Sequence, residues 1–120
     1  MRDTEAIQSL AIEFEDCQKI LSALGDEVRQ YLIVQMMYNG KDCNGMRVPE
    51  ITKLTHLSRS AVSHHLQILK DAGIVRMRRE GTMNYYYFAD DNSIEKLIAA
   101  LQHANAIIKA LPDRSGESDG

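Results

Sequence analysis

The sequence of 120 residues has no tryptophan, two cysteines and two prolines. Two cysteines are too few for the disulfide framework that stabilises many small secreted domains. No apolar run approaches the roughly 20 residues of a membrane-spanning helix. The first sixteen residues contain five acids and lack the basic start of a signal peptide. From these absences we expect a cytoplasmic protein.

The chain has the length of a single domain, and its 44% apolar and 26% charged residues are ordinary for a globular protein. We expect one domain over residues 1–111 and a flexible tail over residues 112–120, which are polar and rich in glycine and serine. The sequence has no glycine-rich phosphate loop, no nucleophile elbow and no His-Glu-x-x-His motif. It therefore predicts a protein that is not an enzyme.

Charge is unevenly distributed along the chain, whose net charge is −3. Residues 1–46 carry a net charge of −4, residues 47–87 carry +4, and residues 88–120 carry −3. A basic middle segment in an acidic chain indicates a local surface for anions such as DNA phosphates. Chance clustering of charge on a solvated face is the alternative.

The spacing of apolar residues predicts five helices, over residues 5–22, 27–38, 49–55, 59–72 and 93–110. Gly25 ends the first helix and Asp26 caps the second. The second helix is apolar on most sides, which favours a central, buried position. Pro49 suits the first turn of the third helix, because that position needs no amide donor.

The helix predicted over residues 59–72 has two distinct faces. Ser58 is a suitable N-cap for it. The inward face is apolar and carries Ala61, Val62, Leu66 and Leu69. The opposite face is polar and carries Ser60, Ser63, His64 and Gln67. Only a short turn, residues 55–57, separates this helix from the preceding one.

Two runs rich in β-forming residues follow, over residues 74–79 and 83–88, around a three-residue turn that contains Gly81. Two short helices, a tight turn and a hairpin follow the order of a winged helix-turn-helix. The sequence therefore predicts a mostly helical α+β fold, with about five helices and a two-stranded wing. Tyr86 falls on the opposite strand face from its two tyrosine neighbours, which favours strand packing over base stacking.

Double-stranded DNA is the partner that this arrangement suits. A recognition helix fits the major groove, and short polar side chains let its backbone approach the base edges. We expect the bases to be read by Ser60, Ser63, His64 and Gln67. We expect the phosphates to be held by Arg59, Arg76, Arg78 and Arg79.

Two other interpretations stay open from the residues alone. The polar helix face could simply be solvated, and the arginines of the hairpin could protect a strand edge. A winged helix can also bind proteins, but its exposed face is then more often apolar. Arginines beside a small polar face therefore favour DNA over a protein partner.

Three stretches of the sequence resemble the ArsR/SmtB repressors. They are residues 21–29 (LSALGDEVR), residues 57–75 (LSRSAVSHHLQILKDAGIV) and residues 78–87 at the spacing of the wing. The resemblance covers about residues 15–110. It implies a homodimer formed through the first and last helices, which binds an inverted-repeat operator. It also implies a repressor whose effector lowers the affinity for DNA.

The metal sites of that family are incomplete in this sequence. The positions that resemble its Cys-x-Cys pair hold Arg47 and Pro49, which cannot ligate a metal. In the last-helix site the acid is Asp90 and one histidine is His103, while the other two positions hold an asparagine and an alanine. Because zinc normally takes four good ligands, we predict no metal and no cofactor, with an unknown effector. Asp90 and His103 are the remaining metal candidates.

The two thiols allow a reversible disulfide that changes the geometry of the dimer. Cys17 lies on the apolar side of the first helix, where a small buried side chain is the usual interpretation. Cys43 lies in a polar loop, where a thiol is more exposed and more reactive. The alternative to a repressor without such sites is therefore a metal- or thiol-responsive repressor, using Cys43 or the pair Asp90 and His103.

Overall fold

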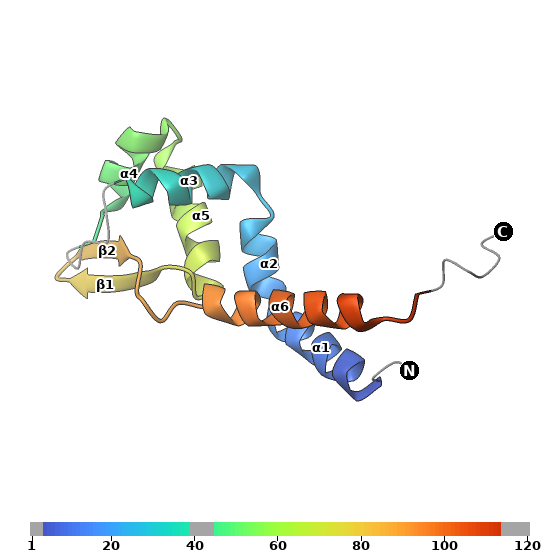
Figure 1. Cartoon of the computed structure of the whole chain (residues 1–120). Helices are drawn as coiled ribbons and strands as arrows, with labels where there is room; N and C mark the ends of the chain where they lie inside the picture. Colours follow the sequence, from blue (N-terminus) through green and yellow to red (C-terminus); the bar gives the residue numbers. More distant parts are fainter. Residues whose placement is uncertain (1–3, 39–44, 114–120) are drawn as a thin grey trace.

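The computed structural model describes residues 4–38 and 45–113. In this part of the chain, six α-helices and a two-stranded antiparallel hairpin follow one another (Figure 1). The elements are α1 Thr4–Asp16, α2 Gln18–Leu24, α3 Glu27–Met37, α4 Val48–Thr55, α5 Arg59–Asp71, β1 Arg76–Glu80, β2 Met83–Tyr87 and α6 Ile94–Ala110. The predicted α+β fold with a two-stranded wing is confirmed. Cys43 lies outside the described residues.

The single helix predicted over residues 5–22 is wrong, because the chain forms two helices that meet at Cys17. This residue departs from helical geometry, with φ −98° and ψ 6°. Its N–H is shared between the carbonyls of Glu13 and Phe14, each at 3.1 Å. α2 enters the core with two buried residues, whereas α1 has none. The bend at Cys17 therefore separates a core helix from a projecting one.

The helix predicted over residues 27–38 is confirmed as α3, but its predicted burial on most sides is wrong. Leu32, Ile33 and Met36 face the core. On the other side, Val34 is 46% exposed and Met37 is 53% exposed. The reason is the position of α3, which lies along the outside of the molecule and packs mainly against α2 and α4 (Figure 1).

The core is built around the inward face of α5. Val62, Leu66 and Leu69 have no solvent exposure, as their helical spacing predicts. They belong to one apolar cluster with Leu32 of α3 and Ile51 of α4. Because burial of apolar surface drives this packing, the opposite face of α5 is turned toward solvent.

The turn between α4 and α5 is short and well bonded. His56 adopts the left-handed conformation, with φ 59°, and ends α4. Thr55 Oγ1 donates a hydrogen bond to the carbonyl of Ile51 at 2.9 Å. Ser58 Oγ accepts one from the N–H of Ala61 at 3.1 Å and starts α5, so the predicted cap is confirmed. These bonds fix where the exposed face of α5 begins.

β1 and β2 form the predicted hairpin, but its turn has two residues instead of three. Glu80 is paired with Met83, so the turn consists of Gly81 and Thr82. Gly81 has φ 61°, which is the conformation that tight hairpin turns require. Tyr86 packs against the core, as its place in the strand alternation predicts.

α6 starts beside the end of α5 and then leaves the body of the molecule. Ser93 Oγ donates a hydrogen bond to the carbonyl of Ala72 at 2.6 Å. The side chain of Asn92 accepts one from the N–H of Ile94 at 3.0 Å. Further along, α6 lies beside α1, and the two helices project together (Figure 1).

The projecting part of α6 leaves several large apolar side chains exposed, namely Ile98, Leu101 and Ile108, with Leu111 just after the helix. An apolar face of this kind normally packs against another surface. Within residues 4–38 and 45–113, no helix is both long and apolar enough to cross a membrane.

Gly73 offers a test of the junction between α5 and α6. Its φ is 77°, and a Cβ at this position meets the Cβ and Oγ of Ser93 at 3.1 and 3.2 Å. Gly81 also has a positive φ, of 61°, but a Cβ there meets no atom within 4 Å. We expect Gly81→Ala to lower the free energy of unfolding by about 1–2 kcal/mol, and Gly73→Ala by about 2–4 kcal/mol. Urea unfolding followed by circular dichroism checks this, and equal losses would contradict the close approach of Ser93.

Candidate nucleic-acid interface

The outward face of α5 holds short polar side chains. The structure places the four predicted base-reading residues on this face, all exposed: Ser60, Ser63, His64 and Gln67. Arg59, the first residue of α5, is exposed at one end of the same helix. Ser60 Oγ lies 3.2 Å from the Oγ of the cap residue Ser58. A face of this size and polarity lets a base edge approach the helix closely.

Gln67 already has a hydrogen-bond partner on this face. Its Nε2 donates to Asp71 Oδ1 at 2.9 Å, one helical turn along α5. This bond uses one of the two amide N–H donors and directs the side chain along the helix toward Asp71. Gln and Asp four residues apart on a helix are a recognised stabilising pair, and this spacing was the available sequence signal for the contact.

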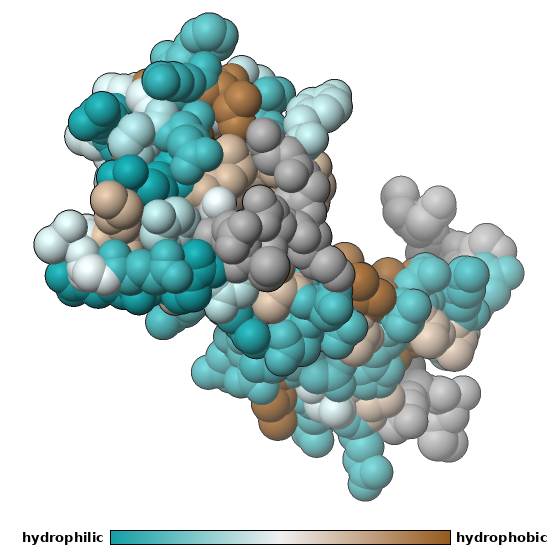
Figure 2. All heavy atoms as spheres, turned by 90° about the vertical axis from the view of Figure 1, so that its left-hand side faces the viewer, coloured by the Kyte–Doolittle hydropathy of each residue, from teal (hydrophilic) through white to brown (hydrophobic). Residues whose placement is uncertain are grey.

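The three arginines of β1 do not form one cluster. Side chains alternate along a strand. The register therefore puts Arg76 and Arg78 on the face of Tyr85 and Tyr87, and Arg79 on the other face. The hairpin faces the viewer in Figure 2 and presents mainly hydrophilic surface. Its cations are thus distributed over both sides of the wing.

Arg76 binds the segment that precedes α6. Its Nη2 lies 3.0 Å from Asp91 Oδ1 and 3.5 Å from the Asp91 carbonyl. The hydrogen bond from the Arg76 side chain lowers the pKa of the Asp91 carboxyl below its usual range. Both side chains are exposed, so water and salt screen the pair. A phosphate can therefore compete with Asp91 for this guanidinium.

Arg78 and Arg79 are oriented by contacts within the hairpin. The guanidinium carbon of Arg78 lies 4.9 Å from the centroid of the Tyr85 ring, and its Nε lies 3.6 Å from Glu80 Oε1. Arg79 Nε donates a hydrogen bond to the carbonyl of Gly81 at 3.1 Å. Arg79 is exposed next to the turn, whereas Arg78 is half-buried.

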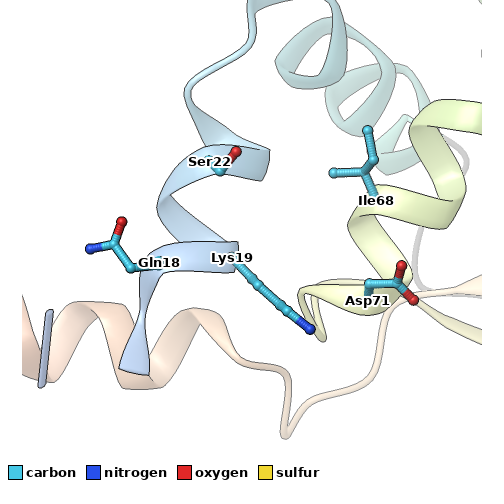
Figure 3. A pocket seen from close by; sticks show the side chains of 5 residues that line it. All are labelled: Gln18, Lys19, Ser22, Ile68 and Asp71. Atoms are coloured by element: carbon cyan, nitrogen blue, oxygen red, sulfur yellow. The ribbon is translucent and has the colours of Figure 1, made fainter. Parts of the chain in front are cut away.

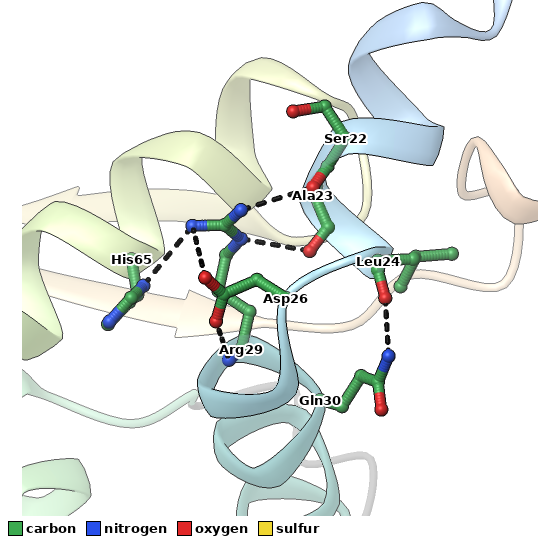
Figure 4. Close-up of polar contacts among 7 residues, drawn as sticks. All are labelled: Ser22, Ala23, Leu24, Asp26, Arg29, Gln30 and His65. Atoms are coloured by element: carbon green, nitrogen blue, oxygen red, sulfur yellow. Dashed lines mark hydrogen bonds and ion pairs between the residues drawn. The ribbon is translucent and has the colours of Figure 1, made fainter.

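Arg29 is a buried arginine near the start of α3 that the sequence analysis missed (Figure 4). Its Nε donates to the carbonyl of Ala23 at 2.8 Å, and its Nη2 donates to that of Ser22 at 3.1 Å. Its Nη1 lies 3.4 Å from His65 Nδ1 and 3.8 Å from Asp26 Oδ2. One guanidinium therefore joins the end of α2, the start of α3 and the middle of α5.

Burial, hydrogen bonds and charge in this cluster shift two pKa values. Burial, and then the charge of Arg29, hold the pKa of His65 below its ordinary value. The neutral ring can accept a hydrogen bond at Nδ1 from the guanidinium, which is always protonated. The backbone N–H of Arg29, at 3.0 Å, lowers the pKa of the Asp26 carboxyl. The predicted Asp26 cap is thus confirmed, and an arginine three residues after it was the available sequence signal.

The metal candidates Asp90 and His103 are not brought together within one chain. Asp90 is exposed before α6, whereas His103 lies further along the helix. His103 Nδ1 is 3.0 Å from both carboxylate oxygens of Glu13, which joins α6 to α1. In the described part of the chain, no three histidine, cysteine, aspartate or glutamate side chains gather where they could hold a metal ion.

Of the two cysteines, only Cys17 lies among the described residues. Cys17 is completely buried in the core, as the apolar pattern of the first helix predicts. A thiol without solvent access reacts poorly with an external oxidant. The predicted role of Cys43 falls outside the described residues.

Comparison with known proteins relates this chain to regulators of transcription. A family model described as "Bacterial regulatory protein, arsR family" matches residues 26–77, from the cap of α3 into β1. An uncharacterized HTH-type transcriptional regulator from Methanocaldococcus jannaschii is 38% identical over 91 residues, which are 74% of this chain and 98% of the relative.

Two further similar proteins differ in coverage. A cadmium resistance transcriptional regulatory protein CadC homolog from Staphylococcus aureus is 31% identical over 69% of this chain, which spans only 64% of that relative. A solution structure from Mycobacterium bovis, described as a homodimeric winged helix-turn-helix DNA-binding domain, has a TM-score of 0.58. It is 21% identical, over 86% of this chain and 92% of that one, so it supports the fold.

His65 predicts a pH-dependent stability. The imidazole of His65 is protonated near pH 6.5 in the unfolded chain, whereas in the folded protein its pKa is lower. The contribution of His65 to the free energy of unfolding is therefore present above about pH 6.5 and is lost as the pH falls through its lowered pKa.

Urea unfolding between about pH 5 and 8 checks this behaviour. His65→Gln should remove this part of the pH dependence, and the control His64→Gln, exposed on the same helix, should retain it. A profile for His65→Gln that matches the unsubstituted protein would contradict the assignment.

Proposed function

We propose that this chain, which belongs to the arsR family of bacterial regulatory proteins, binds an operator as a homodimer and represses the genes beside it. The observation that carries the proposal is the exposed polar face of α5, held outward by the complete burial of Val62, Leu66 and Leu69. A face for a protein partner would more often be apolar. We infer that the protein acts in the cytoplasm, where such an operator is found.

We infer that α5 enters the major groove and reads the base edges with Ser60, Ser63, His64 and Gln67. Their side chains are exposed and, in the serines, short enough for the helix backbone to approach the bases. Gln67 exchanges its bond to Asp71 for a bidentate contact to a base, which is the geometry that favours adenine.

The phosphates are held by Arg59 at the start of α5 and by the arginines of the wing. Arg79 is exposed beside the turn, and the guanidinium of Arg78 lies over the ring of Tyr85. Arg76 contributes after it releases Asp91. Contacts to phosphates fix the position of the protein on the duplex without reading its sequence.

The projecting helices α1 and α6 form the dimer interface in this proposal. α6 exposes Ile98, Leu101 and Ile108, which a second copy would bury. The Mycobacterium bovis domain of the same fold is described as homodimeric. A two-fold dimer presents two copies of α5 about one helical turn of DNA apart, which matches an inverted repeat.

The base-reading role of Gln67 is tested by the substitution Gln67→Ala. Loss of a bidentate contact should weaken operator binding by about 1–3 kcal/mol and relax the preference at one base position. Fluorescence anisotropy on a duplex from the upstream region of the gene, and on duplexes with single changes, measures both effects. Gln30→Ala, exposed on α3 and outside α5, the wing and the projecting helices, is the matched control. Equal losses on every duplex would exclude base reading by Gln67.

The phosphate roles of Arg78 and Arg79 are tested by Arg78→Ala and Arg79→Ala in a salt series. Each substitution should weaken operator and unrelated duplex alike, and should lower the slope of log affinity against log salt by about 1. Lys109→Gln, at the far end of α6, is the matched loss of one positive charge. A slope that stays unchanged in both arginine variants would argue against contacts to phosphate.

A further inference from the structure

A solvent-open cavity of about 400 Å³ lies between α2 and α5 (Figure 3). Gln18, Lys19 and Ser22 line it from α2, and Ile68 and Asp71 line it from α5. Its volume is within the range of roughly 300–1,000 Å³ that small-molecule sites occupy. The cavity is thus large enough for a small effector, and one of its walls is the recognition helix itself.

Two opposite charges lie on the two walls of this cavity. Figure 3 shows the side chain of Lys19 extending from α2 toward Asp71 on α5. Among the described residues, no ion pair within 4 Å joins this ammonium to this carboxylate. Ile68 offers apolar surface beside them. A ligand that fits has a cationic nitrogen for Asp71, an anionic group for Lys19 and a small apolar part for Ile68.

We propose that this cavity is an effector site for a small zwitterion of the amino-acid class. The ligand ammonium binds the Asp71 carboxylate, the ligand carboxylate binds the Lys19 ammonium, and the ligand side chain covers Ile68. Charge-assisted hydrogen bonds to both side chains give the site its selectivity, because a ligand with one charge can pair with either Lys19 or Asp71 but not with both.

Asp71 connects the cavity to the DNA-binding face, and this step rests on the proposed function. The same carboxylate accepts the hydrogen bond from Gln67 Nε2 at 2.9 Å. A ligand ammonium on Asp71 weakens that bond and frees the Gln67 amide for a base. The zwitterion therefore raises the affinity for the operator, unlike the effector that the family resemblance implies, which lowers it. By linkage, the operator raises the affinity for the zwitterion.

The site itself is tested without DNA. Isothermal titration calorimetry of the full chain with each standard L-amino acid, at millimolar concentration, should find binding by one or a few of them. Butylamine and butyrate, which carry one charge each, should not bind. Lys19→Gln and Asp71→Asn should each abolish the heat of binding, whereas Lys109→Gln should retain it. Absence of binding by every amino acid, or binding that survives both cavity substitutions, overturns the site.

The coupling is tested by operator affinity with and without the amino acid that binds. We expect at least a fivefold tighter operator complex in its presence, which is the lower end of typical allosteric coupling. Asp71→Asn should bind the operator more tightly without ligand and should not respond to it. An unchanged or weaker operator complex overturns the coupling. If the protein binds the operator no more tightly than an unrelated duplex, the proposed function is overturned. The calorimetry still decides whether the cavity binds an amino acid.

Discussion

Complete burial of one side of α5 is the constraint on which the candidate interface depends. Val62, Leu66 and Leu69 have no solvent exposure. Each fully buried side chain of this size contributes about 1.5–3 kcal/mol, so a rotation of α5 that exposed them would be strongly unfavourable. The helix is therefore fixed about its own axis. Because its other face has no core partner, Ser60 and Gln67 remain on the outside.

Arg29 adds a second constraint, which acts between helices. A buried guanidinium is tolerated only when its donors are bonded, and here it bonds the carbonyls of Ala23 and Ser22 and contacts Asp26 and His65. The end of α2, the start of α3 and the middle of α5 are thus held as one unit. α1 and α6 pack mainly against each other and also contact α2, and Leu97 and Ala100 of α6 belong to the same apolar core as α5. The projecting pair is therefore connected to this unit through α2 and the buried side of α6.

Local signals in the sequence were sufficient for the helix-turn-helix and its wing. Ser58 caps α5 through a contact three residues away, and the strand alternation of Tyr86 is set by its immediate neighbours. The burial of α3 and the partner of His103, by contrast, depend on contacts distant in sequence. α3 has apolar residues on most sides, but only the packing decides which of them are covered. The partner of His103 is Glu13, ninety residues earlier, which no spacing rule within one helix can find.

The sequence predicted where the side chains of the candidate site lie, but not which partners they contact. The outward placement of Ser60, Ser63, His64 and Gln67 follows from the helical period alone. What the period does not show is which groups already have partners, such as Gln67 with Asp71 and Arg76 with Asp91. Those bonds decide what must be exchanged when a duplex binds.

The most direct test of the account is chemical-shift mapping of the ¹⁵N-labelled protein titrated with a duplex from its upstream region. The account predicts that the largest changes fall on amides of residues 58–67 and of residues 79–84, which are the hairpin turn and the strand ends beside it. A scrambled duplex should give smaller changes at the α5 positions. Changes concentrated on the outward side of α3, with α5 unaffected by either duplex, would contradict the assignment of α5 as the DNA-reading element.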